Sequence, residues 1–129
     1  MDDELHIGKR SRNIILLLQS MYYLATALWP LIDIDSFMQI SGYKNDTWLV
    51  KTVSVLILCI GLALIADIPR KAKSFSTVVL AISSGLGLLC VDLFYSLSNV
   101  ISDIYLADAA LQLVFVLLWV FWLLRYKIL

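Results

Sequence analysis

The chain has 129 residues, its formal net charge at pH 7 is zero, and 61% of its residues are hydrophobic. Soluble domains contain about 45–50% apolar residues, so this composition excludes an ordinary water-soluble protein. The Lys and Arg residues are scattered rather than gathered into a stripe, which excludes a nucleic-acid partner. The apolar residues form four blocks, each about as long as a bilayer is thick. The sequence therefore predicts an all-α, polytopic membrane protein embedded in a lipid bilayer.

The chain begins with a polar tail, residues 1–12, which we expect to lie in the cytoplasm. The first span runs from about Asn13 to Leu31, near the ~20 residues that cross ~30 Å of hydrocarbon. A basic start followed by an apolar stretch also resembles a secretory signal peptide. We reject a cleaved signal because polar and aromatic residues interrupt the apolar stretch, beginning with Gln19 and Ser20.

The first loop, Ile32 to Thr47, is the longest connection between spans. Within it Asp35 is placed to cap a short helix that continues to Ile40, and Gly42 supplies the stop. The helix would present its apolar residues to one side. We therefore expect it to lie in the outer membrane interface or to fold over the mouth of the bundle.

The remaining spans run from about Trp48 to Ile68, Ser74 to Tyr95 and Asp108 to Leu124. Pro69 ends the second span because proline cannot continue a helix. The short basic connection through Lys73 then forces the second and third spans into a hairpin. Residues 13–129 are thus predicted to form one antiparallel four-helix transmembrane bundle.

The distribution of Lys and Arg predicts the orientation, because positive residues are retained in the cytoplasm. Both termini should be cytoplasmic in a multi-pass protein of the plasma (inner) membrane. The opposite side holds only Lys44 and Lys51 among basic residues, and it collects aspartates. In the inner turn, Asp67 is placed to pair with Arg70 or Lys71. The basic residues on the inner side are Lys9, Arg10, Arg12, Arg70, Lys71, Lys73, Arg125 and Lys127.

Helices in lipid associate through close packing at small residues and through a few hydrogen bonds. The third span carries two overlapping pairs of small residues spaced four apart, and the second span offers a matching patch. We interpret these as packing sites; the alternative is that residues 83–85 form a local break that lines a binding site. The expected packing residues are Ala81, Ser83, Ser84, Gly85, Gly87 and Gly61.

Polar side chains within spans are costly and therefore suggest function. Lys51, Asp92, Asp108 and Gln112 lie at similar depth near the outer end of their spans. If they face inward, Lys51 could pair with Asp92 or Asp108 and form a charged mouth. The structural alternative is a Lys–Asp pair that only fixes the helix register. Side chains of the first span that would lie below this mouth are Gln19, Tyr22 and Thr26.

Templates for metal, cofactor and enzyme chemistry are not met by this sequence. The outer aspartates suit solvated loops or helix caps better than a cation site, so we predict no metal. Cys59 and Cys90 form no C-x-x-C pair, and we expect them to be packing residues. No catalytic motif and no cofactor-binding loop occurs. The outer aspartates concerned are Asp33, Asp35, Asp46 and Asp103.

A further indication comes from Trp29 to Leu31, the Ser36–Phe37 pair and the segment Ser41–Val53. Together they look like the first loop of a group of small, uncharacterised four-helix bacterial membrane proteins. The most distinctive part is the string G-x-K-x-D-x-W-L-V-K-T-V at the entry to the second span. More loosely, the layout is similar to that of DoxX-like proteins, whose functional residues have no match here. The resemblance implies no activity, but it makes three positions the first to mutate: Asp46, Trp48 and Lys51.

These observations favour a non-enzymatic protein that binds a lipophilic ligand or a partner membrane protein near the outer leaflet. One alternative is a small ion or solute transporter or channel that acts as an oligomer, such as a homodimer. Another is a membrane enzyme that acts on a lipid or quinone, with Asp92 and either Tyr22 or Lys51 as its acid–base pair. The sequence does not decide among these three.

Overall fold

The computed structural model describes residues 2–43, 45–70 and 74–126, and every regular element in these ranges is a helix. Four helices are long and apolar enough to cross a membrane. The prediction of an all-α fold is therefore confirmed for these ranges, and the four long apolar helices suit a multi-pass membrane protein. The helices are α1 (Asp2–Ile32), α2 (Ile34–Ser41), α3 (Thr47–Ala66), α4 (Phe75–Leu97) and α5 (Tyr105–Tyr126).

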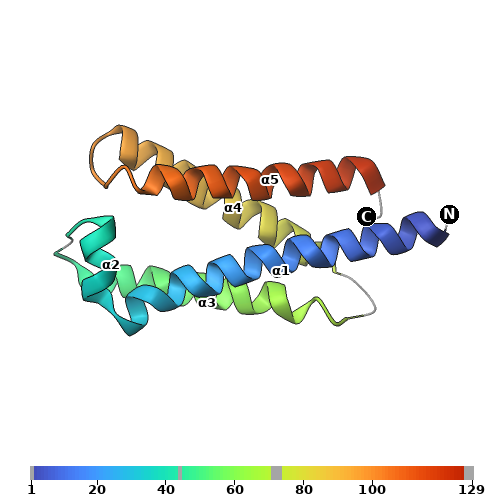
Figure 1. The fold of residues 1–129 in the computed structure, drawn as a ribbon, viewed down its shortest axis with the longest axis horizontal. Helices are drawn as coiled ribbons and strands as arrows, with labels where there is room; N and C mark the ends of the chain where they lie inside the picture. Colours follow the sequence, from blue (N-terminus) through green and yellow to red (C-terminus); the bar gives the residue numbers. More distant parts are fainter. Residues whose placement is uncertain (1, 44, 71–73, 127–129) are drawn as a thin grey trace.

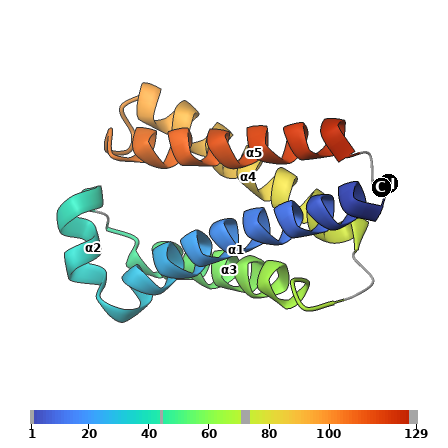
Figure 2. The same ribbon diagram turned by 45° about the vertical axis from the view of Figure 1, so that its right-hand side comes forward.

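The four long helices form two pairs, because α1 packs chiefly against α3 and α4 packs chiefly against α5. Figure 1 shows the pairs side by side, with the start of α1 and the end of α5 at one end of the molecule and α2 at the other. We call these the terminal end and the α2 end. The turned view in Figure 2 shows the same arrangement, with the pairs diverging toward the α2 end.

The core lies where the pairs approach each other. It is built from the apolar stripe of α1, which includes Ile15 and Leu16, and from Trp119 and Trp122 of α5. The two indole rings meet edge to face at 5.7 Å between centroids. The indole N–H of Trp122 donates to the carbonyl of Gly8 at 2.8 Å, so this buried polar group is satisfied.

Helix α1 begins at Asp2, so it includes the segment that the sequence predicted as a separate polar tail. The reason is visible at Arg12, which is 1% exposed and is buried in the bundle rather than solvated. Its Nη2 atom lies 2.6 Å from Asp67 Oδ2 and donates to the carbonyl of Ser74 at 2.9 Å. The expected pair between Asp67 and Arg70 is present at 3.4 Å. The predictions for Lys44, Lys71, Lys73 and Lys127 fall outside the described residues.

The short helix predicted in the first loop is present, but its cap is Asp33 and not Asp35. Asp33 Oδ1 accepts a hydrogen bond from the backbone N–H of Ser36 at 3.2 Å. The prediction was wrong because α2 already begins at Ile34, so Asp33 immediately precedes its free N–H groups and Asp35 lies inside its first turn. Gly42 ends the helix as predicted, with a φ of 100° that favours glycine.

Small residues of α4 divide into an inward pair and an outward pair. Ala81 and Gly85 are buried, as predicted, and a Cβ added to Gly85 would lie 3.1 Å from Val116 Cγ2 of α5. Ser83 is exposed and Gly87 faces open space, so the packing role predicted for this pair is wrong. The alternative of a break at residues 83–85 is also wrong, because α4 is continuous there.

Other packing expectations are met only in part. Gly61 is buried, but it packs against Tyr23 and Leu24 of α1 and not against the third span. Ser84 contributes a hydrogen bond rather than a flat surface. Cys59 and Cys90 were expected to be packing residues, but both are exposed.

The difference between the two glycines of α4 gives a direct prediction. Gly85→Val should lower the free energy of unfolding by roughly 1–2 kcal/mol, because overpacking a close helix contact forces the backbones apart. Gly87→Val places the same side chain in open space and should change stability by less than ~0.5 kcal/mol. Unfolding of both variants in mixed micelles of mild detergent and dodecyl sulfate measures this, and equal losses would contradict the packing.

Candidate functional site

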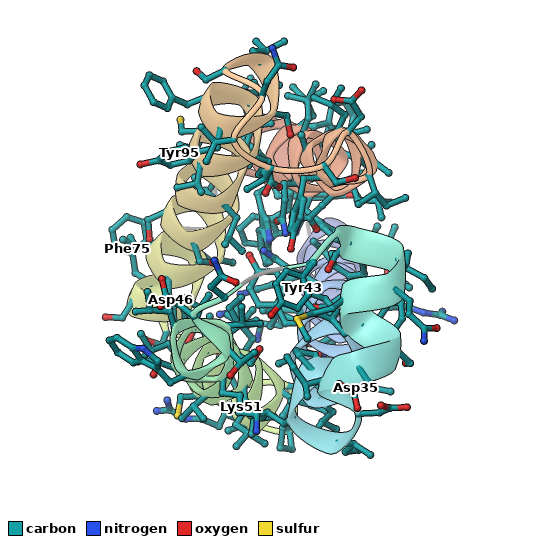
Figure 3. The ribbon with its side chains drawn as sticks, turned by 90° about the vertical axis from the view of Figure 1, so that its left-hand side faces the viewer. Asp35, Tyr43, Asp46, Lys51, Phe75 and Tyr95 are labelled. Carbon is teal, nitrogen blue, oxygen red and sulfur yellow. The ribbon has the colours of Figure 1, made fainter. Side chains whose placement is uncertain are left out.

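A cavity of about 550 Å³ lies between the two helix pairs toward the α2 end, and its wall is mostly apolar. Figure 3 looks onto that end of the molecule. All five helices contribute to the wall, each through one face. From α3 these are Leu49, Val50, Val53, Ser54 and Ile57, and from α2 they are Phe37, Ile40 and Ser41.

Two carboxyl groups, those of Asp92 on α4 and Asp108 on α5, interrupt this apolar wall. Asp108 Oδ1 accepts hydrogen bonds from the Tyr22 hydroxyl and, at 3.4 Å, from Gln112 Nε2. The Asp92 carboxyl is close enough to that of Asp108 to interact with it. Asp108 is therefore held by α1 and by its own helix, and Asp92 lies beside it.

Asp92 differs from Asp108 in its hydrogen bonding. The residue is 4% exposed. Its Oδ2 atom is buried and has no hydrogen-bond partner among the described residues. A buried carboxylate oxygen without a partner is costly, since nothing replaces the water that it has lost. Asp92 thus lines the cavity and carries an acceptor that no described residue uses.

A network of buried polar side chains lies next to the carboxyl groups and links α1, α4 and α5. Tyr23 is at its centre, with its hydroxyl 2.9 Å from Ser84 Oγ and donating to Gln112 Oε1 at 3.4 Å. Gln112 in turn donates to Asp108, as described above. The network therefore fixes the rotamer of Gln112 and, through it, one side of Asp108.

Gln19 holds the same network to the core. Its Nε2 donates to the Tyr23 hydroxyl at 3.1 Å and to the Ala81 carbonyl at 3.0 Å. Its Oε1 accepts from Trp119 Nε1 at 2.7 Å. One fully buried glutamine therefore joins α1 to both α4 and α5.

Several site residues predicted from the sequence are brought together by the structure. Asp92, Asp108, Gln112, Tyr22 and Thr26 all line the cavity. Gln19 lies in the adjoining network. The Thr26 hydroxyl donates within its own helix, to the Tyr22 carbonyl at 2.9 Å, and is thus already occupied.

Lys51 is not part of this site, and its predicted pairing with Asp92 or Asp108 is wrong. It is exposed, it does not line the cavity, and it makes no ion pair with either aspartate within the described residues. Figure 3 shows it at the edge of the molecule, on the outer side of α3. Depth alone suggested the pairing, but the rotation of α3 directs its neighbours Val50 and Ser54 inward instead.

The outer-loop candidates are also separate from the cavity. Asp35, Asp46 and Trp48 are exposed and none lines it. Figure 3 shows Asp35 on α2 and Asp46 just before α3, on different sides of this end. Within the described part of the chain, no group of three or more His, Cys, Asp or Glu side chains is arranged to hold a metal ion.

The prediction missed Tyr23, Ser84 as a hydrogen-bonding residue, and Trp119. Trp119 lies toward the C-terminal end of α5 and is fully buried. Its spacing contained the signal, because Gln112 and Trp119 are two helical turns apart and share one face of α5. Tyr23 likewise follows Gln19 by four residues on α1.

The fold and the cavity are those of a small helical protein with four candidate membrane spans and a mostly apolar cavity that contains two acidic groups. Comparison of the chain with protein-family models, curated proteins and solved structures gives no match. The function must therefore be argued from this cavity.

Proposed function

We propose that this protein binds a lipophilic small molecule in the cavity between its two helix pairs. In this proposal the four long helices cross the bacterial plasma membrane as an antiparallel bundle. The Lys and Arg residues near the terminal end keep both termini in the cytoplasm. The cavity then opens near the outer leaflet, and α2 lies in the outer interface.

The observation that carries the proposal is the cavity itself. Ligand sites in proteins are typically clefts of about 300–1,000 Å³, mostly apolar and with a few polar groups that fix orientation. The cavity of about 550 Å³ has this size and this wall, and its polar groups gather around Asp92 and Asp108. A structural protein that needed only helix packing would fill this space with side chains.

Entry to the cavity is available from the α2 end. Ile40, Leu49 and Val53 line the cavity and are also 55%, 44% and 49% exposed. These side chains therefore line the cavity where it is accessible from the surroundings. A lipophilic molecule dissolved in the outer leaflet would therefore reach the cavity without crossing the core.

Filling the cavity tests the proposal. Ser54 of α3 is buried and lines the cavity, whereas Val55 beside it is 46% exposed and does not. Ser54→Phe should reduce retention of a co-purified lipophilic molecule at least ~10-fold, because the ring occupies the ligand's volume and ~1.4 kcal/mol of lost binding is tenfold. Val55→Phe should retain it. Native mass spectrometry in gentle detergent measures the bound mass, and equal retention by folded samples of both variants would refute the proposal.

Transport by an oligomer remains the alternative. Two acidic groups in a membrane cavity suit a pathway for a cation or proton. At the terminal end, however, Trp119, Trp122 and the Arg12–Asp67 pair are buried, so the described part of one chain offers no open route there. Flux through liposomes that contain the protein would favour transport, whereas binding without flux supports the proposal above.

A further inference from the structure

We infer that the ligand is a lipophilic cation, such as a protonated amine on an apolar body, with its charged group between Asp92 and Asp108. This inference rests on the proposed function, because it assigns a chemical class to the molecule in the same cavity. The groups that support it are the two carboxyls, the residues around them and the aromatic rings of the wall.

Asp92 carries an acceptor that no described residue uses. Its Oδ2 is buried without a partner in the described structure, while the residue lines the cavity. An N–H donor from a ligand would satisfy this oxygen, and a charged donor would do so about twice as strongly as a neutral one. The site therefore selects for a ligand that donates.

The charged groups around the cavity favour a cationic ligand. No Lys, Arg or His is among the described residues that line the cavity. Arg12 and Arg70 pair with Asp67 in the turn after α3, and Lys51 faces outward. Two carboxylates that interact at short range repel each other when both are ionised, and a cation between them relieves that repulsion. An anionic ligand would add to it.

The two aspartates have different roles in this site. Asp108 is positioned by the Tyr22 hydroxyl and Gln112 and has Oδ1 already engaged. The Oδ2 atom of Asp92 has no donor among the described residues. Asp92 is therefore the primary partner of the cation, and Asp108 adds charge from a fixed position. Loss of the Asp92 charge should weaken cation binding more than loss of the Asp108 charge.

The rest of the wall suits an organic cation better than a metal ion. A hard divalent cation requires about six to eight oxygen ligands, and most of this wall is apolar. Aromatic rings, in contrast, attract organic cations through their π faces. The aromatic residues that line the cavity are Tyr22, Tyr23, Trp29, Phe37, Tyr95 and Tyr105.

The test uses three probes that share one apolar body and differ in charge: 1-naphthylmethylamine, 1-naphthalenemethanol and 1-naphthoate. Binding to the full chain in nanodiscs of zwitterionic lipid is measured by equilibrium dialysis, with empty nanodiscs as the blank. We expect the amine to bind at least ~10-fold more tightly than the alcohol, and the carboxylate to bind most weakly, since ~1.4 kcal/mol corresponds to tenfold. A wild-type protein that prefers the alcohol or the carboxylate overturns the inference without any variant.

Variants then locate the charge. Asp92→Asn should weaken amine binding at least ~10-fold and leave alcohol binding within ~2-fold. Asp108→Asn should have a smaller effect on the amine. Asp103→Asn is the matched control, because Asp103 is exposed and does not line the cavity. An unchanged amine-to-alcohol ratio in folded Asp92→Asn also overturns the inference.

Failure of the inference and failure of the proposed function are distinguishable. If the alcohol binds, Ser54→Phe abolishes that binding, and the amine has no advantage, then the cavity binds lipophilic molecules but does not select cations. If no probe binds and Ser54→Phe changes nothing in the mass spectrum of the purified protein, both proposals fall.

Discussion

Arg12→Met is expected to lower the free energy of unfolding by about 3–5 kcal/mol, because removing one partner of a buried ion pair leaves the other charge unpaired. The Arg12 and Asp67 side chains are 1% and 3% exposed, and their closest N–O distance is 2.6 Å. The substitution also removes the donor to the Ser74 carbonyl. Arg70 lies 3.4 Å from Asp67 but is itself largely exposed, so it compensates only in part. Unfolding in mixed micelles with increasing dodecyl sulfate gives the measurement.

Two comparisons make the Arg12 prediction specific. Arg10→Met removes the same charge type from an exposed position on the same helix and should cost less than ~0.5 kcal/mol. The double variant Arg12→Met with Asp67→Leu should cost less than Arg12→Met alone, because an apolar pair often replaces a buried ion pair without loss. If the double variant costs as much as the two single changes added together, the pair does not act as a unit.

Gln19→Leu is expected to lower the free energy of unfolding by about 1–3 kcal/mol, since it leaves a buried donor without a partner. This donor is the Trp119 indole N–H, in a residue that is 0% exposed. The Ala81 carbonyl also loses Gln19 but keeps its hydrogen bond from the Ser84 hydroxyl at 3.2 Å. Leucine has nearly the volume of glutamine, so the loss measures hydrogen bonding more than packing. Thermal and dodecyl sulfate unfolding both report it.

Gln39→Leu provides the matched control for Gln19. Gln39 is exposed on α2, and the same substitution there should change stability by less than ~0.5 kcal/mol. Equal effects at the two positions would show that Gln19 does not join the helices through its amide. Hydrogen bonds between membrane helices average only ~0.6 kcal/mol in some systems, so a loss of that size would mean that the network relaxes around the gap.

The Gln19 network also bears on the cavity. Gln19 holds the Tyr23 hydroxyl, Tyr23 donates to Gln112, and Gln112 donates to Asp108. The chain of contacts runs from the core to the carboxyl pair. A side chain of the core therefore supports the position of Asp108, which explains why a small protein keeps so many polar groups inside an apolar bundle.

The sequence by itself determined the class of protein and the position of its helices along the chain. Bilayer thickness and hydropathy placed the second to fourth spans within three residues of α3, α4 and α5. Depth along each span also grouped Asp92, Asp108 and Gln112 with Tyr22, and the structure places these side chains around one cavity. These properties depend on the length and the local composition of each segment, and both can be read directly from the sequence.

Tertiary structure alone decided which way each helix faces. All four spans are apolar around their circumference, so periodicity does not show that Gly85 faces inward and Gly87 outward, or that Lys51 faces away from the aspartates. The Arg12–Asp67 pair joins residues 55 positions apart, and only the packing of α1 against α3 brings them together. Helix rotation in lipid is set by contacts with neighbouring helices, and those contacts cannot be predicted from the sequence of one span alone.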